Sequence, residues 1–440
     1  MTFPYHIKEH KIPSQHVREY PRATAHSQDD VLYLAIKQYI PKDNPDPQPG
    51  DVTIIGTHAN GFPKELYEAL WAELYESAKS NGFRIRSIWI ADISNQGYSG
   101  ILNEHTMGDD PSWNDHARDL LHMINVFRAD MPRPIIGLGH SFGANILAHL
   151  SLLHPRLITT LVAFDPTITR FTFQTKGPGI TPARGSAFRR EVWPSREAAA
   201  ESFSRSPFYK AWDPRVLEAW VQHGLRPMPT ATLPATADGD KVEGQVTLAT
   251  SRHQELFTFF RPLYPYYKHD GSGVDLSKIP EFDAAAHEDF DARVPFPFYR
   301  AEGANILRRL PELRPSILWV FGGTSDLSAP DKRRHKMAVT GTGVNGSGGA
   351  AAGRVAEIVM EGRGHLFPME VPDQCADHAA RWIGREMVRW REEQAEYLEW
   401  TRRPFLEKAT MSEEFLRRVG PPPQRNGDTQ KEKKNGEPKL

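Results

Sequence analysis

The chain has 440 residues, of which 39% are hydrophobic and 25% are charged, so it is long enough to bury a large core in one elaborated domain or in two. Its 54 Lys and Arg residues nearly balance its 55 Asp and Glu residues, which argues against nucleic acid or another polyanion as a partner. The single cysteine, Cys375, excludes an internal disulfide, and no apolar run is long enough to predict a transmembrane segment.

The first part of the chain alternates short apolar runs with segments of helical pattern. Residues 1–30 are rich in His, Arg and Pro and predict an irregular lead-in with at most one edge strand. Strands are then expected at 31–39, 52–55, 83–91, 135–138 and 161–164, and helices at 64–80, 110–129 and 141–153. This alternation predicts an α/β fold, in which a mostly parallel sheet is covered on both faces by helices.

The alternation stops at Pro166 and resumes only at about residue 315. The stretch between holds helical patterns and a Pro- and Gly-rich loop at 226–244, and we interpret it as a large, mainly helical cap insertion over the carboxyl edge of the sheet. Strands at 317–321 and 355–360, a Gly-rich loop at 341–353 and a long helix from about residue 373 complete the core. The predicted domains are a core of residues 1–166 and 315–418, a cap of residues 167–314 and a disordered tail of residues 419–440.

The long final helix and the tail carry further signals. Ile383, Met387, Trp390, Tyr397 and Trp400 recur at helical spacing, which predicts that they pack in the core. The tail is polar and charged and ends in Pro438-Lys439-Leu440, a tripeptide close to the S-K-L address of peroxisomes. It predicts recognition by the peroxisomal import receptor and a peroxisomal location, with a chance tail on a cytoplasmic protein as the alternative.

Gly139-His140-Ser141-Phe142-Gly143 is the most informative motif in the sequence. This G-x-S-x-G pentapeptide follows a predicted strand and precedes a predicted helix, which is the context that a nucleophile elbow requires. The turn is so tight that side chains two residues before and after the serine would collide with backbone. The motif therefore predicts that Ser141 is an exposed nucleophile at the carboxyl end of its strand.

A serine hydroxyl needs a general base, and the base needs an orienting carboxylate. His365 follows a glycine in the loop after the last predicted strand, in the chain order of serine, acid and histidine, so we predict it as the base. Two aspartates compete for the third position. Asp326 follows the strand at 317–321 and is preferred, whereas Asp165 ends the strand at 161–164 and is the alternative.

The loop after the strand at 52–55 is the candidate for an oxyanion hole. Its small residues would let a backbone N–H approach the substrate, and we expect the N–H of Asn60, with Gly61 as the fallback, to act with the N–H of Phe142. His58 is expected to hold this loop by hydrogen bonds. No H-E-x-x-H or C-x-x-C spacing occurs, so no metal and no organic cofactor are predicted.

Four motifs together resemble a known group of proteins. The sequences at 15–22, 58–65, 139–143 and 364–368 are similar to those of fungal α/β-hydrolases of the peroxisomal lipase type, which include homologues recruited to host-selective toxin biosynthesis. The resemblance covers residues 15–400. It implies an α/β-hydrolase fold and a Ser-Asp-His hydrolase that acts on an acyl ester or a related lipid-like acyl substrate.

The sequence therefore predicts a serine esterase, lipase or thioesterase that works through an acyl-enzyme on a small-molecule acyl substrate. An aromatic cluster at 257–267 favours an apolar acyl or aromatic substrate, although packing within the cap explains the cluster equally well. One rival is an acyl-transfer or cyclising enzyme of secondary metabolism on the same fold. The other is a binding protein that keeps the scaffold without catalysis.

Overall fold

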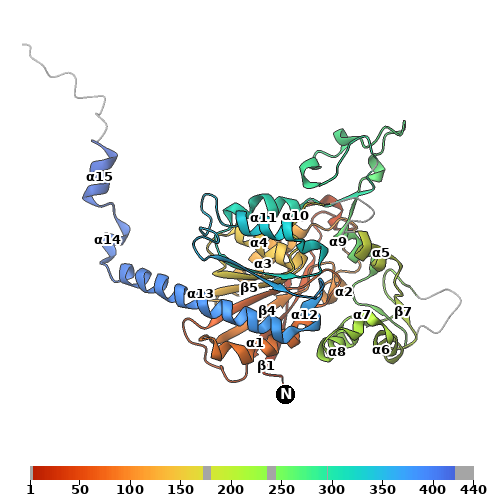
Figure 1. Ribbon diagram of the computed structural model, residues 1–440, viewed down its shortest axis with the longest axis horizontal. Helices are drawn as coiled ribbons and strands as arrows, with labels where there is room; N and C mark the ends of the chain where they lie inside the picture. The colour runs from red at the N-terminus through yellow and green to blue at the C-terminus, as the bar shows by residue number, and fades with distance from the viewer. Residues whose placement is uncertain (1–2, 172–179, 235–243, 295, 422–440) are drawn as a thin grey trace, which may run out of the picture. The chain divides into compact units, whose positions relative to one another are not determined.

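A mixed eight-stranded sheet organises the chain (Figure 1). The computed structural model describes residues 3–171, 180–234, 244–294 and 296–421. The strands lie in the order β1 (Tyr5–Pro13), β2 (Tyr33–Pro41), β4 (Ile85–Ala91), β3 (Val52–Thr57), β5 (Ile135–His140), β6 (Thr160–Phe164), β12 (Ser316–Gly322) and β13 (Val355–Met360). β1 and β2 pair antiparallel, β2 is antiparallel to β4, and every later pair is parallel. The predicted mostly parallel sheet is confirmed, and the predicted irregular lead-in contains a nine-residue edge strand.

Helices cover both faces of the sheet. Figure 1 shows α3 (Trp113–Val126), α4 (Phe142–Leu153), α10 (Glu302–Arg309) and α11 (Pro330–Val339) on one side and α1 (Glu68–Ser80) on the other. The core joins the two layers, with Ile55 and Trp89 of the sheet in one cluster with Leu120 of α3 and Ile146 of α4. Because β4, β3, β5, β6, β12 and β13 pair in parallel, their carboxyl ends lie at one edge of the sheet.

The segment between β6 and β12, called the insertion below, holds short helices and two small sheets. Its helices are α5 (Ile180–Phe188), α6 (Arg196–Arg205), α7 (Pro207–Lys210), α8 (Pro214–His223), α9 (Arg252–Phe259) and α10. One sheet has the order β7 (Val192–Trp193), β9 (Val246–Leu248), β8 (Leu225–Pro227), and the other pairs β10 (Arg261–Pro262) with β11 (Phe298–Tyr299). The insertion and the sheet fall in one compact unit, residues 1–388, so the predicted division at 166 and 314 stays a prediction.

The remaining elements connect the strands or follow them. They are α2 (Gly97–Leu102), α12 (Phe367–Glu370), α13 (Pro372–Thr401), α14 (Phe405–Ala409), α15 (Glu413–Val419), the 3-10 turns η2 (Lys64–Tyr67) and η7 (Asp326–Ser328), and shorter turns at 21–23, 264–266, 276–278, 284–286 and 310–312. α13 has 30 residues, but no helix in the described ranges carries an apolar stretch that could cross a bilayer.

The end of α13, α14 and α15 belong to a second unit, residues 389–440. Ile383 and Met387 of α13 are buried as predicted, because they lie in the first unit. Tyr397 and Trp400 are 52% and 42% exposed, so the prediction that they pack in the core is wrong. The tripeptide Pro438-Lys439-Leu440 lies outside the described residues, and peroxisomal import stays a prediction.

Candidate functional site

Ser141 lies in a strained turn between β5 and α4. Its φ and ψ are 59° and −122°, a backbone conformation that a residue with a side chain rarely adopts. A Cβ added at Gly139 would lie 2.7 Å from the Cα of Ala144, and one at Gly143 would lie 2.6 Å from the carbonyl oxygen of His58. The expected steric reason for the two glycines is therefore confirmed, and the turn has the form of a nucleophile elbow. The prediction of an exposed serine is wrong, because Ser141 is only 7% exposed.

The Ser141 hydroxyl meets an imidazole that a carboxylate holds from the other side. The Nε2 of His365 lies 2.9 Å from the Oγ of Ser141, and its Nδ1 lies 2.6 Å from the Oδ2 of Asp165. His365 comes from the loop after β13, and Asp165 directly follows β6. The three side chains thus converge from three strands of the sheet at its carboxyl edge.

The acid beside His365 is Asp165, and this corrects the expectation that Asp326 would lie there. Asp326 begins the turn η7 with an exposed side chain, and within the described residues no hydrogen bond or ion pair joins it to His365. The loop after β12 contributes the hydroxyls of Ser325 and Ser328 in its place, and both donate to the Asp165 carboxylate.

Asp165 is fully buried, yet it is stabilised as a carboxylate. Besides the two serine hydroxyls, its oxygens accept a hydrogen bond from the N–H of Gly322 at 3.0 Å. Burial by itself raises the pKa of Asp165, but the hydrogen bond from His365, its charge and the two hydroxyls together hold that pKa below its usual value. A charged carboxylate at this place fixes the proton of His365 on Nδ1 and leaves Nε2 free to accept from Ser141.

Three residues around this site were not predicted from the sequence. Thr167 places its Oγ1 3.1 Å from the Oγ of Ser141, and its N–H donates to the Ser141 carbonyl at 3.1 Å. Ser325 and Ser328 are the other two. The only sequence signal for them is their position, because Thr167 lies two residues after Asp165 and the serines flank Asp326.

Hydrogen bonds in the loop after β3 single out one backbone donor. The N–H of Ala59 donates to the hydroxyl of Tyr67 at 2.9 Å, and the N–H of Gly61 donates to Oε1 of Gln96 at 2.8 Å. The N–H of Asn60 has no partner among the described residues. Gly61 is therefore excluded as the fallback donor, and Asn60 keeps a free N–H. The N–H of Phe142 belongs to the first turn of α4, where such groups lack intrahelical partners.

Polar side chains from outside hold this loop in place. The Nε2 of His58 accepts from the N–H of Ile93 at 3.0 Å, and its Nδ1 lies 2.9 Å from the carbonyl of Ala59, which matches the expected structural role. Gln96 donates to Oδ1 of Asn60 at 2.7 Å, and Asn60 donates to the backbone carbonyl of Glu255 in α9 at 3.1 Å. The insertion therefore contacts the loop directly through α9.

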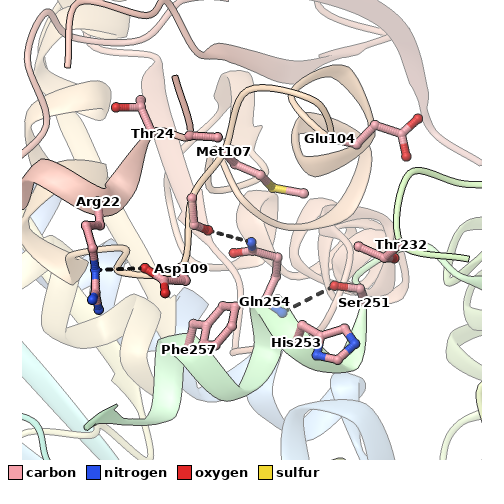
Figure 2. A pocket seen from close by; sticks show the side chains of 12 residues that line it. Arg22, Thr24, Glu104, Met107, Asp109, Thr232, Ser251, His253, Gln254 and Phe257 are labelled. Atoms are coloured by element: carbon pink, nitrogen blue, oxygen red, sulfur yellow. Dashed lines mark hydrogen bonds and ion pairs between the residues drawn. The ribbon is translucent and has the colours of Figure 1, made fainter. Parts of the chain in front are cut away.

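A second face of α9 lines a pocket of about 450 Å³ (Figure 2). Its twelve lining residues include Arg22, Asp109, Gln254 and Phe257, and none of them is Ser141, His365 or Asp165. Figure 2 shows Arg22 paired with Asp109, and Gln254 bonded to a backbone carbonyl oxygen, that of Gly108. Of the predicted aromatic cluster, Phe257 lines this pocket, whereas Tyr266 and Tyr267 pack on a small apolar core of the insertion.

A buried lysine lies close enough to Asp165 to feel its charge. Lys336 of α11 is 1% exposed, its Nζ is 5.8 Å from the ring centroid of Phe321, and no ion pair of its own is found in the described part of the chain. Burial lowers the pKa of Lys336 to about 8, against the opposing effect of the negative charge of Asp165. The ammonium is thus a destabilising group at neutral pH.

Replacing Lys336 by methionine should raise the free energy of unfolding at pH 7 by on the order of 1–3 kcal/mol. Because the pKa in the folded state, about 8, lies below the ordinary 10.5, the unfolded chain binds more protons between these values. The stability of the unsubstituted protein should then rise with pH across this window, whereas Lys336→Met should lack that rise. Urea denaturation at pH 7, 8, 9 and 10 measures both. Parallel stability curves for the two proteins would contradict the expectation.

The described residues hold no group of three or more His, Cys, Asp or Glu side chains placed to bind a metal ion.

A family model and a solved structure share the fold of this chain. Residues 54–378 match the model of the Alpha/beta hydrolase family. The peroxisomal alpha-beta-hydrolase Lpx1 of Saccharomyces cerevisiae superposes with a TM-score of 0.64 at 14% identity, covering 93% of this chain and 99% of that one.

Sequence relatives agree with this result. The chain is 40% identical over 405 residues to a type I acyl-CoA thioesterase, mpaH, of Penicillium roqueforti, covering 89% of this chain and 90% of the relative. It is 29% identical over 266 residues to the abhydrolase domain-containing protein AFT2-1 of Alternaria alternata, covering 59% and 87%. These relatives confirm the resemblance to fungal α/β-hydrolases and agree with an enzyme that acts on ester bonds. The chain belongs to the alpha/beta hydrolase family.

Proposed function

We propose that the protein is a serine hydrolase that cleaves acyl-coenzyme A thioesters through an acyl-enzyme. The observation that carries the proposal is the continuous contact from Ser141 through His365 to the buried carboxylate of Asp165. The substrate class rests on the 40% identity, over nine-tenths of both chains, to relatives named as acyl-CoA thioesterases.

In the first half of the reaction, the Oγ of Ser141 attacks the thioester carbonyl carbon while Nε2 of His365 takes the hydroxyl proton. Asp165 accepts from Nδ1–H of His365 throughout and stabilises the imidazolium that forms. The negative charge passes to the carbonyl oxygen, where the N–H groups of Phe142 and Asn60 donate to it. The C–S bond then breaks, and His365 returns the proton to the departing thiolate of coenzyme A.

In the second half, a water molecule attacks the ester carbon of the acyl-Ser141. His365 takes one proton from that water and then gives it to the Oγ of Ser141 as the acyl–oxygen bond breaks. The products are a free carboxylic acid and the regenerated serine. The hydroxyl of Thr167, 3.1 Å from Ser141, is placed to donate to the serine oxygen in the resting state.

The proposal is tested by thiol release from a series of acyl-coenzyme A thioesters, read with a chromogenic disulfide and matched to the free acid by mass spectrometry. The single cysteine, Cys375, is buried, so the protein itself should contribute little thiol signal. Equal amounts of thiol and free acid are expected. Turnover of simple p-nitrophenyl esters without turnover of any thioester would contradict the substrate class.

The same assay distinguishes hydrolysis from acyl transfer. Thiol release that begins only after an alcohol or amine acceptor is added, with the acylated acceptor as product, would favour the transferase alternative over the hydrolase. Release that needs only water supports hydrolysis.

A further inference from the structure

A chain of buried hydrogen bonds joins the loop after β3 to the loop that carries His365. The Nε2 of His140, the residue before Ser141, lies 3.0 Å from the backbone carbonyl oxygen of His365. The Nδ1 of His140 lies 2.9 Å from the hydroxyl of Tyr67, which in turn accepts from the N–H of Ala59 at 2.9 Å. The side chains of His140 and Tyr67 form no hydrogen bond with those of Ser141, His365 or Asp165. Neither takes part in the proton transfers of the proposed reaction.

The backbone groups at either end of this series, the N–H of Ala59 and the carbonyl of His365, determine the direction of each hydrogen bond in it. A backbone N–H can only donate, so the Tyr67 oxygen accepts from Ala59 and its own proton goes to Nδ1 of His140. A backbone carbonyl can only accept, so Nε2 of His140 carries the proton that goes to His365. His140 is therefore the neutral Nε2–H tautomer, and each hydrogen bond between Ala59 and His365 has one defined direction.

Burial supports this assignment. His140 is completely buried and Tyr67 is 2% exposed. Burial, with a further contribution from the charge of His365, lowers the pKa of His140 to about 3, so that ring stays neutral at neutral pH. Burial also raises the pKa of the Tyr67 hydroxyl, which keeps its proton available for donation.

The two ends of this series of hydrogen bonds, Ala59 and His365, lie next to groups that the reaction needs. Ala59 precedes Asn60, whose free N–H is the proposed oxyanion donor, and the carbonyl of His365 belongs to the proposed general base. β3 and β13, which lead into these loops, are separated in the sheet by β5, β6 and β12. No backbone ladder therefore links the two loops directly, and the two side chains supply the link.

We propose that Tyr67 and His140 form a positioning bridge, which holds the Asn60 N–H and the His365 imidazole at fixed places on either side of Ser141. This inference rests on the proposed function, because it assigns the bridge a purpose in the same reaction. Neither residue forms a hydrogen bond with the reacting atoms, although the His140 ring packs against the His365 ring with 5.2 Å between their centroids. They act through the loops, and their loss should displace the oxyanion donor relative to the base.

The first test replaces Tyr67 by phenylalanine, which keeps the ring and removes only the hydroxyl. The N–H of Ala59 and Nδ1 of His140 then lose their partners. We expect kcat for an acyl-coenzyme A substrate to fall roughly 10- to 100-fold while KM changes less than about threefold, since the bridge does not contact substrate. The rate constant for fluorophosphonate labelling of Ser141 should fall in parallel, because that reaction uses the same donors.

Tyr5→Phe is the matched control. The Tyr5 hydroxyl is also buried and donates to a backbone carbonyl, that of Trp71, at 3.0 Å, but it lies on the edge strand β1. It should lower the melting temperature about as much as Tyr67→Phe and leave kcat unchanged. If Tyr67→Phe likewise lowers only the melting temperature, the hydroxyl merely satisfies buried groups and the bridge is refuted.

Substitution of His140 gives an independent test by partial rescue. His140→Gln keeps an amide N–H that can reach the His365 carbonyl, whereas His140→Leu offers no donor. Each variant is compared per folded molecule, and we expect Gln to retain about tenfold more kcat than Leu. Equal rates for the two variants would overturn the role of the donor.

Labelling separates failure of the bridge from failure of the proposed function. A protein that is labelled at Ser141 but hydrolyses no acyl-coenzyme A would contradict the substrate class alone, and the labelling rates of the variants would still decide the bridge. A folded protein that is neither labelled nor active would overturn both proposals. An active, labelled protein in which Tyr67→Phe matches wild type would overturn the bridge alone.

Discussion

Replacing Ser141 by alanine should reduce kcat for acyl-coenzyme A hydrolysis by about 10⁵- to 10⁶-fold, because it removes the hydroxyl on which the acyl-enzyme forms and which His365 contacts. The melting temperature should change by only a few degrees. The substitution removes one hydroxyl and keeps the Cβ, so the strained backbone with φ of 59° is the same in both proteins. Steady-state thiol release and scanning calorimetry measure the two effects.

Ser151→Ala provides the matched control. Ser151 is buried on the same helix, α4, and its hydroxyl donates to the carbonyl of Leu147 at 2.9 Å, away from the site. This variant should keep wild-type kcat. A Ser141→Ala protein that turns over substrate as fast as the control would refute the nucleophile.

Asp165→Asn should lower kcat by about 10⁴-fold, whereas Asp326→Asn should leave it within about twofold of wild type. Asparagine fills the same space but carries no charge, so it neither fixes the proton of His365 on Nδ1 nor stabilises the imidazolium. The Asp326 side chain is exposed and does not contact His365, so its charge should have little influence there. The two variants are compared by kcat and by the rate of fluorophosphonate labelling.

A double substitution makes this comparison sharper. If Asp165 is the acid, adding Asp326→Asn to Asp165→Asn should cause no further loss. A loss of activity in Asp326→Asn with full activity in Asp165→Asn would instead restore the acid that the sequence favoured.

The pair of candidate acids shows where inference from sequence reached its limit. Asp165 and Asp326 each follow a strand whose carboxyl end lies at the site, and β6 and β12 are neighbours in the sheet. Strand order in the chain could therefore place either residue near His365. The choice depends on which carboxylate points toward His365. The backbone at Asp165, with φ of 39°, directs its side chain there, and the hydroxyls of Ser325 and Ser328 hold it in place. No periodicity or spacing reports either feature.

The predictions that agreed with the structure rested on local stereochemistry. The two glycines around Ser141 and the alternation of strands and helices follow from steric contact and hydrophobic pattern over a few residues, which a sequence records directly. Contacts between distant segments are different. The donations from Ala59 to Tyr67 and from Gly61 to Gln96 could not have been expected from the sequence, although together they leave Asn60 as the free donor of its loop.

The short path from Asp165 to Thr167 has a consequence for making chimaeras of this protein. The insertion begins with Asp165, directly after β6, and at Thr167 its backbone N–H and hydroxyl already contact Ser141. A graft that exchanges the insertion for that of a relative should keep the native chain through Ile168, which is itself fully buried, and should join the foreign segment after it. A junction placed at Pro166 would replace Thr167, a partner of the nucleophile, together with the rest of the insertion.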